Sequence, residues 1–213
     1  MSVLKKLIPT AWHYPLSNLK RKFTGYKKFS QFGEDLVLLK LFKEKNNGIY
    51  VDVGAHHPYR YSNTYLLHKK GWRGVNIDPN PHTIELFEKA RPNDQNICCG
   101  VGMPATLTYF QFSDPAVNTF VAAQAQKWKE KAFLTFLGTR DVSVRPLSEL
   151  IRGPIDLLTI DVEGMDLEVL QSYGWKQYPT VIIVEGDEST EFLTQKGYKL
   201  YAQRGVSNIF SHT

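Results

Sequence analysis

The chain has 213 residues, of which 42% are hydrophobic and 22% are charged, and its formal net charge is +5. This is the length of one ordinary domain and the composition of a folded protein, so collagen-like, low-complexity and mostly disordered chains are excluded. No apolar run reaches the roughly 18 residues of a membrane-spanning helix, and lysines interrupt the first apolar stretch, so we expect no cleavable signal peptide. The adjacent cysteines Cys98 and Cys99 suit neither an ordinary disulfide nor a zinc knuckle, which favours a reducing, cytoplasmic setting.

The basic residues are concentrated at the N-terminus. Residues 1–30 contain seven Lys or Arg and no acidic residue, whereas the other 183 residues carry 19 basic and 21 acidic side chains. We therefore expect a basic N-terminal arm, residues 1–29, followed by one domain, residues 30–213. Aromatic residues lie among the cations of the arm, so the arm could contact an anionic membrane peripherally or touch nucleic acid; the alternative is a solvated lead-in that packs partly on the domain.

Strand-like and helix-like segments alternate along the domain. In chain order we expect helix 35–45, strand 48–53, helix 63–70, strand 74–78, helix 81–90, strand 95–99, strand 155–161, helix 165–173, strand 180–185 and a closing hairpin of strands 198–202 and 206–210. Segment 101–153 is less regular, with a strand at 106–112 and a helix at 120–131; it is either a lid over a site or an insertion without that role. This alternation is typical of one doubly wound α/β domain.

Carboxylates follow most of the expected strands. In a doubly wound domain, ligands bind outside the carboxyl ends of the strands, where the strand order reverses. Four of the five strand ends there carry an acidic residue, at Asp52, Asp78, Asp161 and Glu185. Because carboxylates are costly to desolvate without partners, this clustering indicates a ligand site.

The first strand end predicts a cofactor that contains adenosine. Gly54 gives a turn at which backbone can approach a ligand closely, and Asp78 lies 24 residues later, near the spacing at which a carboxylate binds ribose hydroxyls. The positions at which a dinucleotide fingerprint would have its next glycines hold His56 and Tyr59. Their bulk disfavours a dehydrogenase that binds NAD or FAD, and it is compatible with a cofactor without phosphates, such as S-adenosylmethionine.

Several motifs in one order resemble the FkbM-type S-adenosylmethionine-dependent methyltransferases. They span residues 30–186 and are Ser30-Gln31-x-Gly33-Glu34-Asp35, Asp52-Val53-Gly54-Ala55-His56-His57-Pro58, Ser62-Asn63-Thr64, Gly71-Trp72-x-Gly74-Val75-Asn76-Ile77-Asp78-Pro79, Ile160-Asp161-Val162-Glu163-Gly164 and Val184-Glu185. The resemblance implies a Rossmann-like class I methyltransferase domain, with a mostly parallel seven-stranded sheet and a C-terminal antiparallel hairpin. It also implies O-methylation of a saccharide or another small-molecule hydroxyl. The chain departs from the family pattern at His56-His57-Pro58, where many members have Asn and Gly.

Carried onto this chain, the resemblance implies a set of cofactor-binding residues: Gln31, Asp52, Gly54, Ala55, Ser62, Asn63, Thr64, Asp78, Pro79, Asn80 and Asp161. Asp52 and Gly54 would lie beside the methionine part, and residues 62–64, at a helix start, would hold its carboxylate. Asp78 would accept the ribose hydroxyls, Asn80 would line the adenine side, and Gln31 would help close the pocket together with Ser30 and Glu34. Ser62 could instead be only a helix N-cap, and Glu34 only a favourable first-turn acid.

Methyl transfer to oxygen needs a group that takes the hydroxyl proton, and two systems are candidates. His56 or His57 could act as a neutral imidazole base, with Asp161 orienting the acceptor or serving as the base itself. Alternatively, Asp161 and Glu185, ending adjacent strands and joined by Asp187 or Glu163, could hold Mg²⁺. Both possibilities remain open at this level.

Two other functions remain as alternatives. A nucleic-acid methyltransferase is supported by the basic arm, but Asp161-Val162-Glu163-Gly164 stands where base-modifying enzymes carry an Asn/Asp-Pro-Pro-aromatic segment, so we do not expect a nucleic-acid partner. A non-catalytic module that binds an adenosine cofactor would keep Asp78 without the carboxylates at Asp161 and Glu185. The sequence predicts neither the acceptor nor the oligomeric state.

Overall fold

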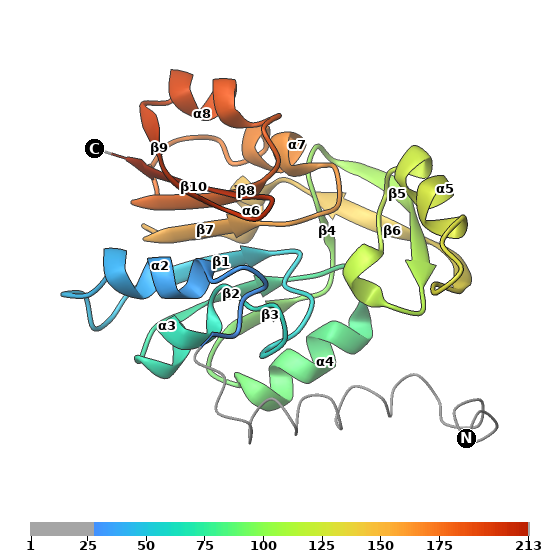
Figure 1. Ribbon diagram of the computed structural model, residues 1–213, viewed down its shortest axis with the longest axis horizontal. Coiled ribbons are helices and arrows are strands. Elements are labelled where there is room, and N and C mark those ends of the chain that lie inside the picture. Colours follow the sequence, from blue (N-terminus) through green and yellow to red (C-terminus); the bar gives the residue numbers. More distant parts are fainter. Residues whose placement is uncertain (1–27, 213) are drawn as a thin grey trace.

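The computed structural model describes residues 28–212, and the expected arm up to residue 27 lies outside them. Seven strands form the main sheet, in the order β3 (Gln95–Ile97), β2 (Arg73–Ile77), β1 (Ile49–Val53), β7 (Leu157–Ile160), β8 (Val181–Glu185), β10 (Ser207–His212) and β9 (Tyr198–Arg204) (Figure 1). The first five are parallel, and β10 runs antiparallel to both of its neighbours. The expected α/β sheet with a reversed C-terminal hairpin is therefore confirmed.

Alternating residues of the central strands build two hydrophobic clusters. In β1, Tyr50 belongs to one cluster, whereas Val51 and Val53 belong to the other. This follows from the period of two in a strand, which sends successive side chains to opposite faces. The first cluster includes the apolar side of α2 (Glu34–Leu41) and Leu67 of α3 (Tyr65–Lys69). The second cluster includes residues of α6 (Leu147–Leu150), α7 (Asp166–Gln171) and α8 (Thr190–Gln195). Helix α4 (Pro81–Ala90) follows β2 in the chain.

Segment 101–153 adds a second, three-stranded sheet. Its strand order is β4 (Gly100–Val101), β6 (Phe136–Arg145) and β5 (Ala105–Phe112), and the 3₁₀ helix η2 (Pro115–Val117) and α5 (Ala122–Lys129) lie between β5 and β6 in the chain. The expected strand and helix of this segment are present. We did not expect β6, because it carries charged residues and a glycine, and most of its side chains are at least partly exposed. The apolar alternation that marks a half-buried strand is confined to Val142 and Val144, too short a run to indicate a ten-residue strand.

Phe29, which precedes the expected start of the domain at residue 30, contacts the domain. The backbone N–H of Phe29 donates a hydrogen bond to Asp35, and its ring packs edge-on against Tyr65 with the ring centroids 4.5 Å apart. Asp35 also accepts hydrogen bonds from the backbone and the hydroxyl of Ser30. Phe29, which the sequence assigns to the arm, is thus fastened to the start of α2 by a buried carboxylate.

Candidate functional site

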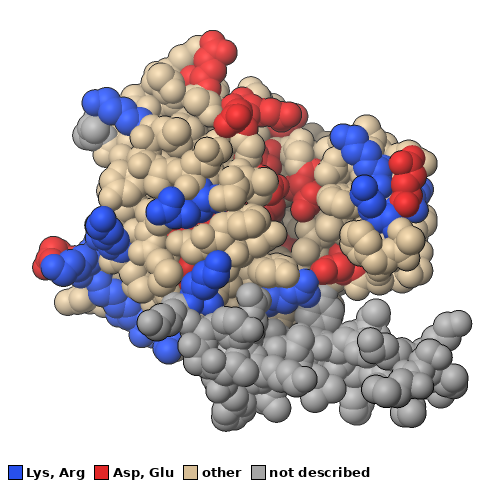
Figure 2. All heavy atoms as spheres, viewed as in Figure 1, with Lys and Arg blue, Asp and Glu red and all other residues tan. Residues whose placement is uncertain are grey.

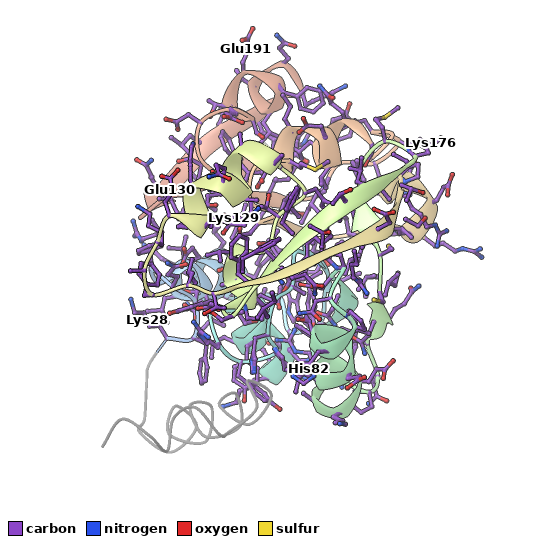
Figure 3. The ribbon with its side chains drawn as sticks, turned by 90° about the vertical axis from the view of Figure 1, so that its right-hand side faces the viewer. Lys28, His82, Lys129, Glu130, Lys176 and Glu191 are labelled. Carbon is purple, nitrogen blue, oxygen red and sulfur yellow. The ribbon has the colours of Figure 1, made fainter. Side chains whose placement is uncertain are left out.

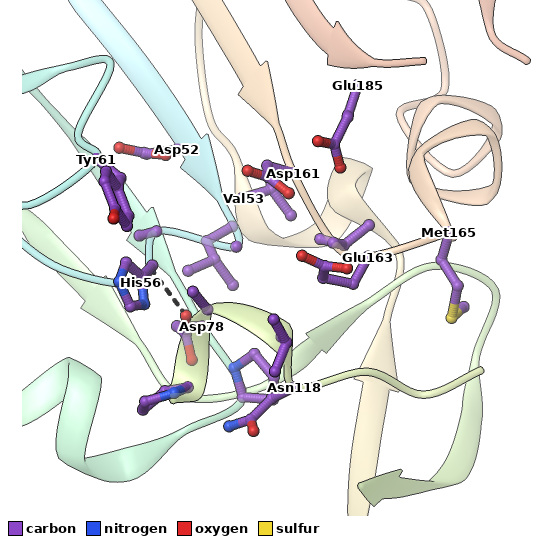
Figure 4. A pocket seen from close by; sticks show the side chains of 18 of the residues that line it. Asp52, Val53, His56, Tyr61, Asp78, Asn118, Asp161, Glu163, Met165 and Glu185 are labelled. Atoms are coloured by element: carbon purple, nitrogen blue, oxygen red, sulfur yellow. Dashed lines mark hydrogen bonds between the residues drawn. The ribbon is translucent and has the colours of Figure 1, made fainter. Parts of the chain in front are cut away.

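A cavity of about 470 Å³ lies between the carboxyl ends of the parallel strands and the second sheet. The strand ends contribute Asp52, Asp78, Asp161 and Glu185, which are the four carboxylates that the sequence indicates (Figure 4). Tyr109 of β5, together with Gln124 and Trp128 of α5, closes the opposite side. Segment 101–153 therefore forms a wall of the cavity.

Most of the expected site residues line this cavity. They are Gln31, Asp52, Gly54, Ala55, His56, Ser62, Asn63, Asp78, Pro79, Asp161 and Glu185. Three expected residues, His57, Thr64 and Asn80, are not among its lining residues. Each of these three has a partner in the protein, as described below.

The end of β1 lies unusually close to the end of β7. Gly54 has a φ of +75°, and a Cβ atom at this position would lie 1.8 Å from the backbone oxygen of Asp161. The backbone N–H of Gly54 donates to Ile77, and that of Asp161 donates to Val53, so both strand ends are fixed. Only glycine fits here, since it lacks the Cβ and tolerates positive φ. The sequence predicted a close approach of Gly54 to a ligand; in the structure Gly54 lines the cavity and also packs against the backbone of Asp161.

The segment after the turn is held by a buried arginine that the sequence analysis missed. The guanidinium of Arg91 donates hydrogen bonds to the hydroxyls of Ser62 and Thr64, at 3.1 Å and 2.9 Å, and to the backbone oxygen of Pro58 at 2.7 Å. The hydroxyl of Thr64 in turn donates to Asp52 at 2.7 Å. Burial raises the pKa of Asp52 to about 6, although this hydrogen bond and Arg91 oppose the shift.

The contacts of residues 62–64 within the chain differ from one residue to the next. Thr64 is the N-cap of α3 but makes no capping hydrogen bond, and α3 is only five residues long. The hydroxyls of Ser62 and Thr64 accept hydrogen bonds from Arg91, and that of Thr64 also donates to Asp52, so both hydroxyls hold the loop in place. Asn63 does line the cavity, and its amide donates to Thr159 at 3.0 Å.

Asp78 closes β2 with its carboxylate buried. One oxygen accepts a hydrogen bond from the backbone N–H of His56 at 3.0 Å, drawn as the dashed line in Figure 4, and the other accepts from that of Asn80 at 2.7 Å. Burial nevertheless raises its pKa to about 6. The side chain of Asn80 accepts from the backbone of His82 and so caps α4. This local role explains why Asn80 does not line the cavity.

The two adjacent histidines are in different environments. His57 is buried, and its Nδ1 accepts hydrogen bonds from the backbone N–H groups of Tyr59 and Arg60, both at 3.1 Å. The ring of His56 lines the cavity and stacks on Tyr61, with the ring centroids 6.1 Å apart. Both ring nitrogens of His56 are buried without a hydrogen-bond partner. Burial, followed by the charge of Arg60, lowers its pKa to about 4, so this imidazole is neutral at pH 7.

Left-handed backbone is concentrated at this cavity. His56, Tyr61 and Glu163 have φ values of 53°, 55° and 56°, and they line the cavity; Trp175 is the remaining non-glycine residue of residues 28–212 with positive φ. Such conformations cost about 1–3 kcal/mol each and persist where the surrounding structure enforces them. Their clustering is typical of a functional site.

Asp161, Glu163 and Glu185 form a carboxylate cluster inside the cavity. One oxygen from each lies within 4.8 Å of the others, and Figure 4 shows the three side chains converging. Loss of hydration in this setting, together with the negative charge of Glu185, raises the pKa of Asp161 well above its usual range even though its side chain is open to the cavity. Burial and Glu185 also raise the pKa of Glu163 to about 7.

No cation of residues 28–212 forms an ion pair with this cluster. Glu163 was named from the sequence only as a neighbour of Asp161, and it belongs to the cluster. Asp187, the other neighbour considered, accepts a hydrogen bond from Asn208 at 2.9 Å instead. The three carboxylates therefore favour binding of a proton, a metal ion or a cationic ligand, because each of these reduces the repulsion between their negative charges.

Three contacts join the second sheet to the loops of the main sheet. Arg60 and Asp114 form an ion pair at 3.0 Å, and the hydroxyl of Thr119 donates to the backbone oxygen of Glu163 at 2.9 Å. Arg140 donates to the backbone oxygen of Pro79. The wall formed by segment 101–153 is thus connected to three of the loops that surround the cavity.

The sequence of the domain matches the model of a known protein family. The model of the methyltransferase FkbM domain matches residues 52–200, more than two thirds of the chain. The chain belongs to the FkbM methyltransferase family. The resemblance inferred from the motifs is therefore confirmed, and the sheet of this FkbM-family chain is the Rossmann-like methyltransferase sheet.

Solved structures with a similar fold share little sequence with this FkbM-family chain. An FkbM methyltransferase from Methylobacillus flagellatus KT is 15% identical with a TM-score of 0.46; the match covers 78% of this chain but 44% of that one, so this chain spans less than half its length. A precorrin-6y C5,15-methyltransferase from Geobacter metallireducens GS-15 is 13% identical with a TM-score of 0.47, covering 91% of this chain and 96% of that one. An O-methyltransferase from Bacillus cereus in complex with SAH is 13% identical with a TM-score of 0.43, covering 96% and 91%. No curated protein matches the sequence.

Proposed function

We propose that this chain is an S-adenosylmethionine-dependent O-methyltransferase that acts on a hydroxyl of a saccharide or another small-molecule acceptor. The carboxylate cluster of Asp161, Glu163 and Glu185, which has no cationic partner in residues 28–212, carries this proposal. S-adenosylmethionine is a cation at its sulfonium and ammonium groups. A ligand of that charge suits a cavity in which carboxylates raise one another's pKa.

The residues of the cavity fit the cofactor at two further points. Asp78 presents a buried carboxylate at the end of β2, the position from which ribose hydroxyls are bound in Rossmann-like folds. Gly54 lines the cavity, and because it has no side chain the end of β1 packs directly against the backbone of Asp161. Asp52 and Asn63 line the same region and would contact the methionine part.

When bound, the cofactor supplies a methyl group from its sulfonium centre. The chain must then place the acceptor hydroxyl in line and accept its proton as the new carbon–oxygen bond forms. We assign proton acceptance to Asp161, because its oxygens are open to the cavity and its raised pKa makes it a stronger base than an ordinary carboxylate. His56 is the competing base; it is neutral at pH 7, but its ring nitrogens are covered and the ring would have to turn first.

A divalent cation is an alternative occupant of the same cluster. Asp161, Glu163 and Glu185 offer the oxygen ligands that Mg²⁺ prefers. Bound there, the metal would act as a Lewis acid that lowers the pKa of the acceptor hydroxyl. A chelator distinguishes this from the metal-free assignment: full turnover in its presence excludes the metal, whereas loss of turnover that Mg²⁺ restores establishes it.

The deciding experiment measures transfer of a labelled methyl group from S-adenosylmethionine to a panel of glycans and small hydroxyl compounds. We expect label on oxygen in at least one acceptor class, and we expect Asp161→Asn to reduce this transfer by about 10²–10⁴-fold while S-adenosylhomocysteine still binds. Binding without transfer to any acceptor would favour a non-catalytic binding module. Transfer to RNA or DNA alone would favour the nucleic-acid alternative. Absence of cofactor binding would overturn the proposed methyltransferase and both of these alternatives.

A further inference from the structure

The loop that follows α5 and the first two residues of β6 expose large apolar side chains. In this tip loop, defined as residues 131–137, Phe133 is 78% exposed, Leu137 58% and Phe136 38%. Lys127, Lys129 and Lys131 lie on or next to the loop, and the ammonium of Lys129 is 4.1 Å from the ring centroid of Phe136. Neither Phe133 nor Leu137 belongs to a hydrophobic cluster, so packing within the domain does not explain them.

A second apolar surface combines with cations beside α2. Phe32, Leu36 and Tyr201 are 38%, 42% and 47% exposed and line an open groove of about 410 Å³. The cations of this α2 groove are Lys28, Lys40 and Arg204, and no acidic side chain lines it. The groove thus has the same composition as the tip loop: exposed apolar side chains with basic residues around them.

The two surfaces lie on either side of the cavity mouth. Phe32 lines both the α2 groove and the cavity, and Trp128, on the helix that leads into the tip loop, lines the cavity from the other side. Figure 2 shows basic side chains on both sides of a crevice that holds acidic ones. In Figure 3, Lys28 and Glu130 lie on one side of the molecule and Lys176 on the other.

The cations of this face have no anionic partner in the described chain. Within residues 28–212, none of the six lysines and arginines of the tip loop and the α2 groove forms an ion pair. The sequence before Lys28 adds six more basic residues and no acidic one. The face therefore complements a surface that is anionic and extended.

We propose that this face binds an anionic lipid bilayer, with Phe133 and Leu137 entering the interface and the basic residues contacting lipid phosphates. Apolar side chains among lysines match the boundary between headgroups and acyl chains. A nucleic acid would use the cations, but it offers no apolar phase for Leu36 and Leu137. None of the helices in the part of the chain that the structure describes is long and apolar enough to cross a membrane. The proposal does not depend on the methyl-transfer reaction.

The test is co-sedimentation of the full chain with vesicles of phosphatidylcholine containing phosphatidylglycerol and with vesicles of phosphatidylcholine alone. We expect binding to the anionic vesicles only, decreasing as salt rises. Phe133→Ser with Leu137→Ser, and separately Lys40→Glu with Arg204→Glu, should each weaken binding by about tenfold or more. Because these side chains are exposed, circular dichroism and the melting temperature should be unchanged.

Two exposed residues away from this face serve as matched controls. Lys176 lies on the opposite side of the molecule, and Met103 lies in the turn between β4 and β5, at the other end of the β5–β6 pair from the tip loop. Lys176→Glu and Met103→Ser should leave vesicle binding unchanged.

Three results would overturn the proposal. Equal vesicle binding by the parent and both double variants would mean that this face takes no part, and the arm alone would then carry any binding. A dimer that becomes a monomer in the Phe133→Ser and Leu137→Ser variant, without vesicle binding by the parent, would assign the tip loop to self-association. Loss of RNA binding rather than vesicle binding in the Lys40→Glu and Arg204→Glu variant would assign the face to nucleic acid.

Discussion

At the scale of single residues, several residues of the cavity lower the stability of the folded chain. His56, Tyr61 and Glu163 hold left-handed backbone, and Asp78 is buried with a raised pKa. These features weaken folding, and they suit binding of a ligand that accepts the carboxylates as partners. Asp78 is the clearest example, since its two oxygens already fix the backbone of the two loops around it.

We expect Asp78→Asn to weaken binding of S-adenosylhomocysteine by about 1.5–3 kcal/mol, the scale of hydrogen bonds to a charged group. The amide keeps the size of the side chain but loses the charge and one acceptor. Calorimetry on the folded variant measures the effect. Asn80→Ala is the control: it should cost about 1 kcal/mol of stability through the lost N-cap of α4, with unchanged affinity. Unchanged affinity of Asp78→Asn would place the ribose elsewhere.

The two candidate bases predict different pH profiles. A carboxylate base must lose its proton, so if Asp161 acts, turnover should rise with pH. The rise should come well above the usual range of a carboxylate, because loss of hydration and the charge of Glu185 raise the pKa of Asp161. If His56 acts, its pKa of about 4 means that it is already deprotonated, and turnover should be flat above about pH 5. Asp161→Asn should lower turnover by about 10²–10⁴-fold and remove the rise, whereas His56→Ala should leave the rise in place. A flat profile in the parent would argue against Asp161.

At the scale of elements, the loop after β1 depends on a side chain from the end of α4. Arg91 is fully buried and joins Pro58, Ser62 and Thr64, which lie about thirty residues earlier in the chain. One guanidinium therefore fixes the segment that presents Asn63 to the cavity.

Arg91→Lys should lower the free energy of unfolding by about 2–4 kcal/mol, because an ammonium cannot reproduce the forked donors and leaves buried oxygens without partners. Urea unfolding measures this. Lys89→Ala, on the exposed side of the same helix, should change stability by less than about 0.5 kcal/mol. A small effect of Arg91→Lys would mean that the loop keeps its hydrogen bonds by other means.

The elements also show what the sequence could and could not predict. Gly54 and the carboxylates at the ends of β2, β7 and β8 could be assigned from local pattern, because strand ends share one edge of a parallel sheet. Arg91 could not, since its partners are distant in sequence and a lysine or arginine after a helix is usually solvated. Strand β6 was missed because apolar alternation covers only Val142 and Val144 near its end, and the rest of the strand is formed by pairing with β5.

At the scale of the whole molecule, the carboxylate cluster opposes folding at neutral pH. The pKa of Glu163 is about 7 in the folded chain against an ordinary value of 4.5. The folded state therefore binds more protons between these values, and stability falls as pH rises through that window. Above about pH 7, Glu163 is ionised in both the folded and the unfolded chain, and the full loss of stability is reached.

Glu163→Gln should accordingly raise the free energy of unfolding at pH 8, by about 0.5–2 kcal/mol, the range of a single favourable substitution. The gain should shrink as the pH falls and vanish near pH 4, where Glu163 is protonated in both states. Thermal unfolding of parent and variant across this range measures it, and Glu191→Gln on exposed α8 should show no such trend. An equal difference at all pH values would show that electrostatic repulsion is not the cause.

The order of strands also determines when the domain can be completed during synthesis. Strand β10 lies between β8 and β9 and supplies every main-sheet hydrogen bond of β9. While a nascent chain lacks Ser207–His212, the apolar strand β8 presents an open edge. Such an edge pairs readily with other chains, and domains form as units when translation delivers their last strand. A ribosome that stalls within the final hairpin would therefore release a chain prone to aggregate, however complete its methyltransferase cavity.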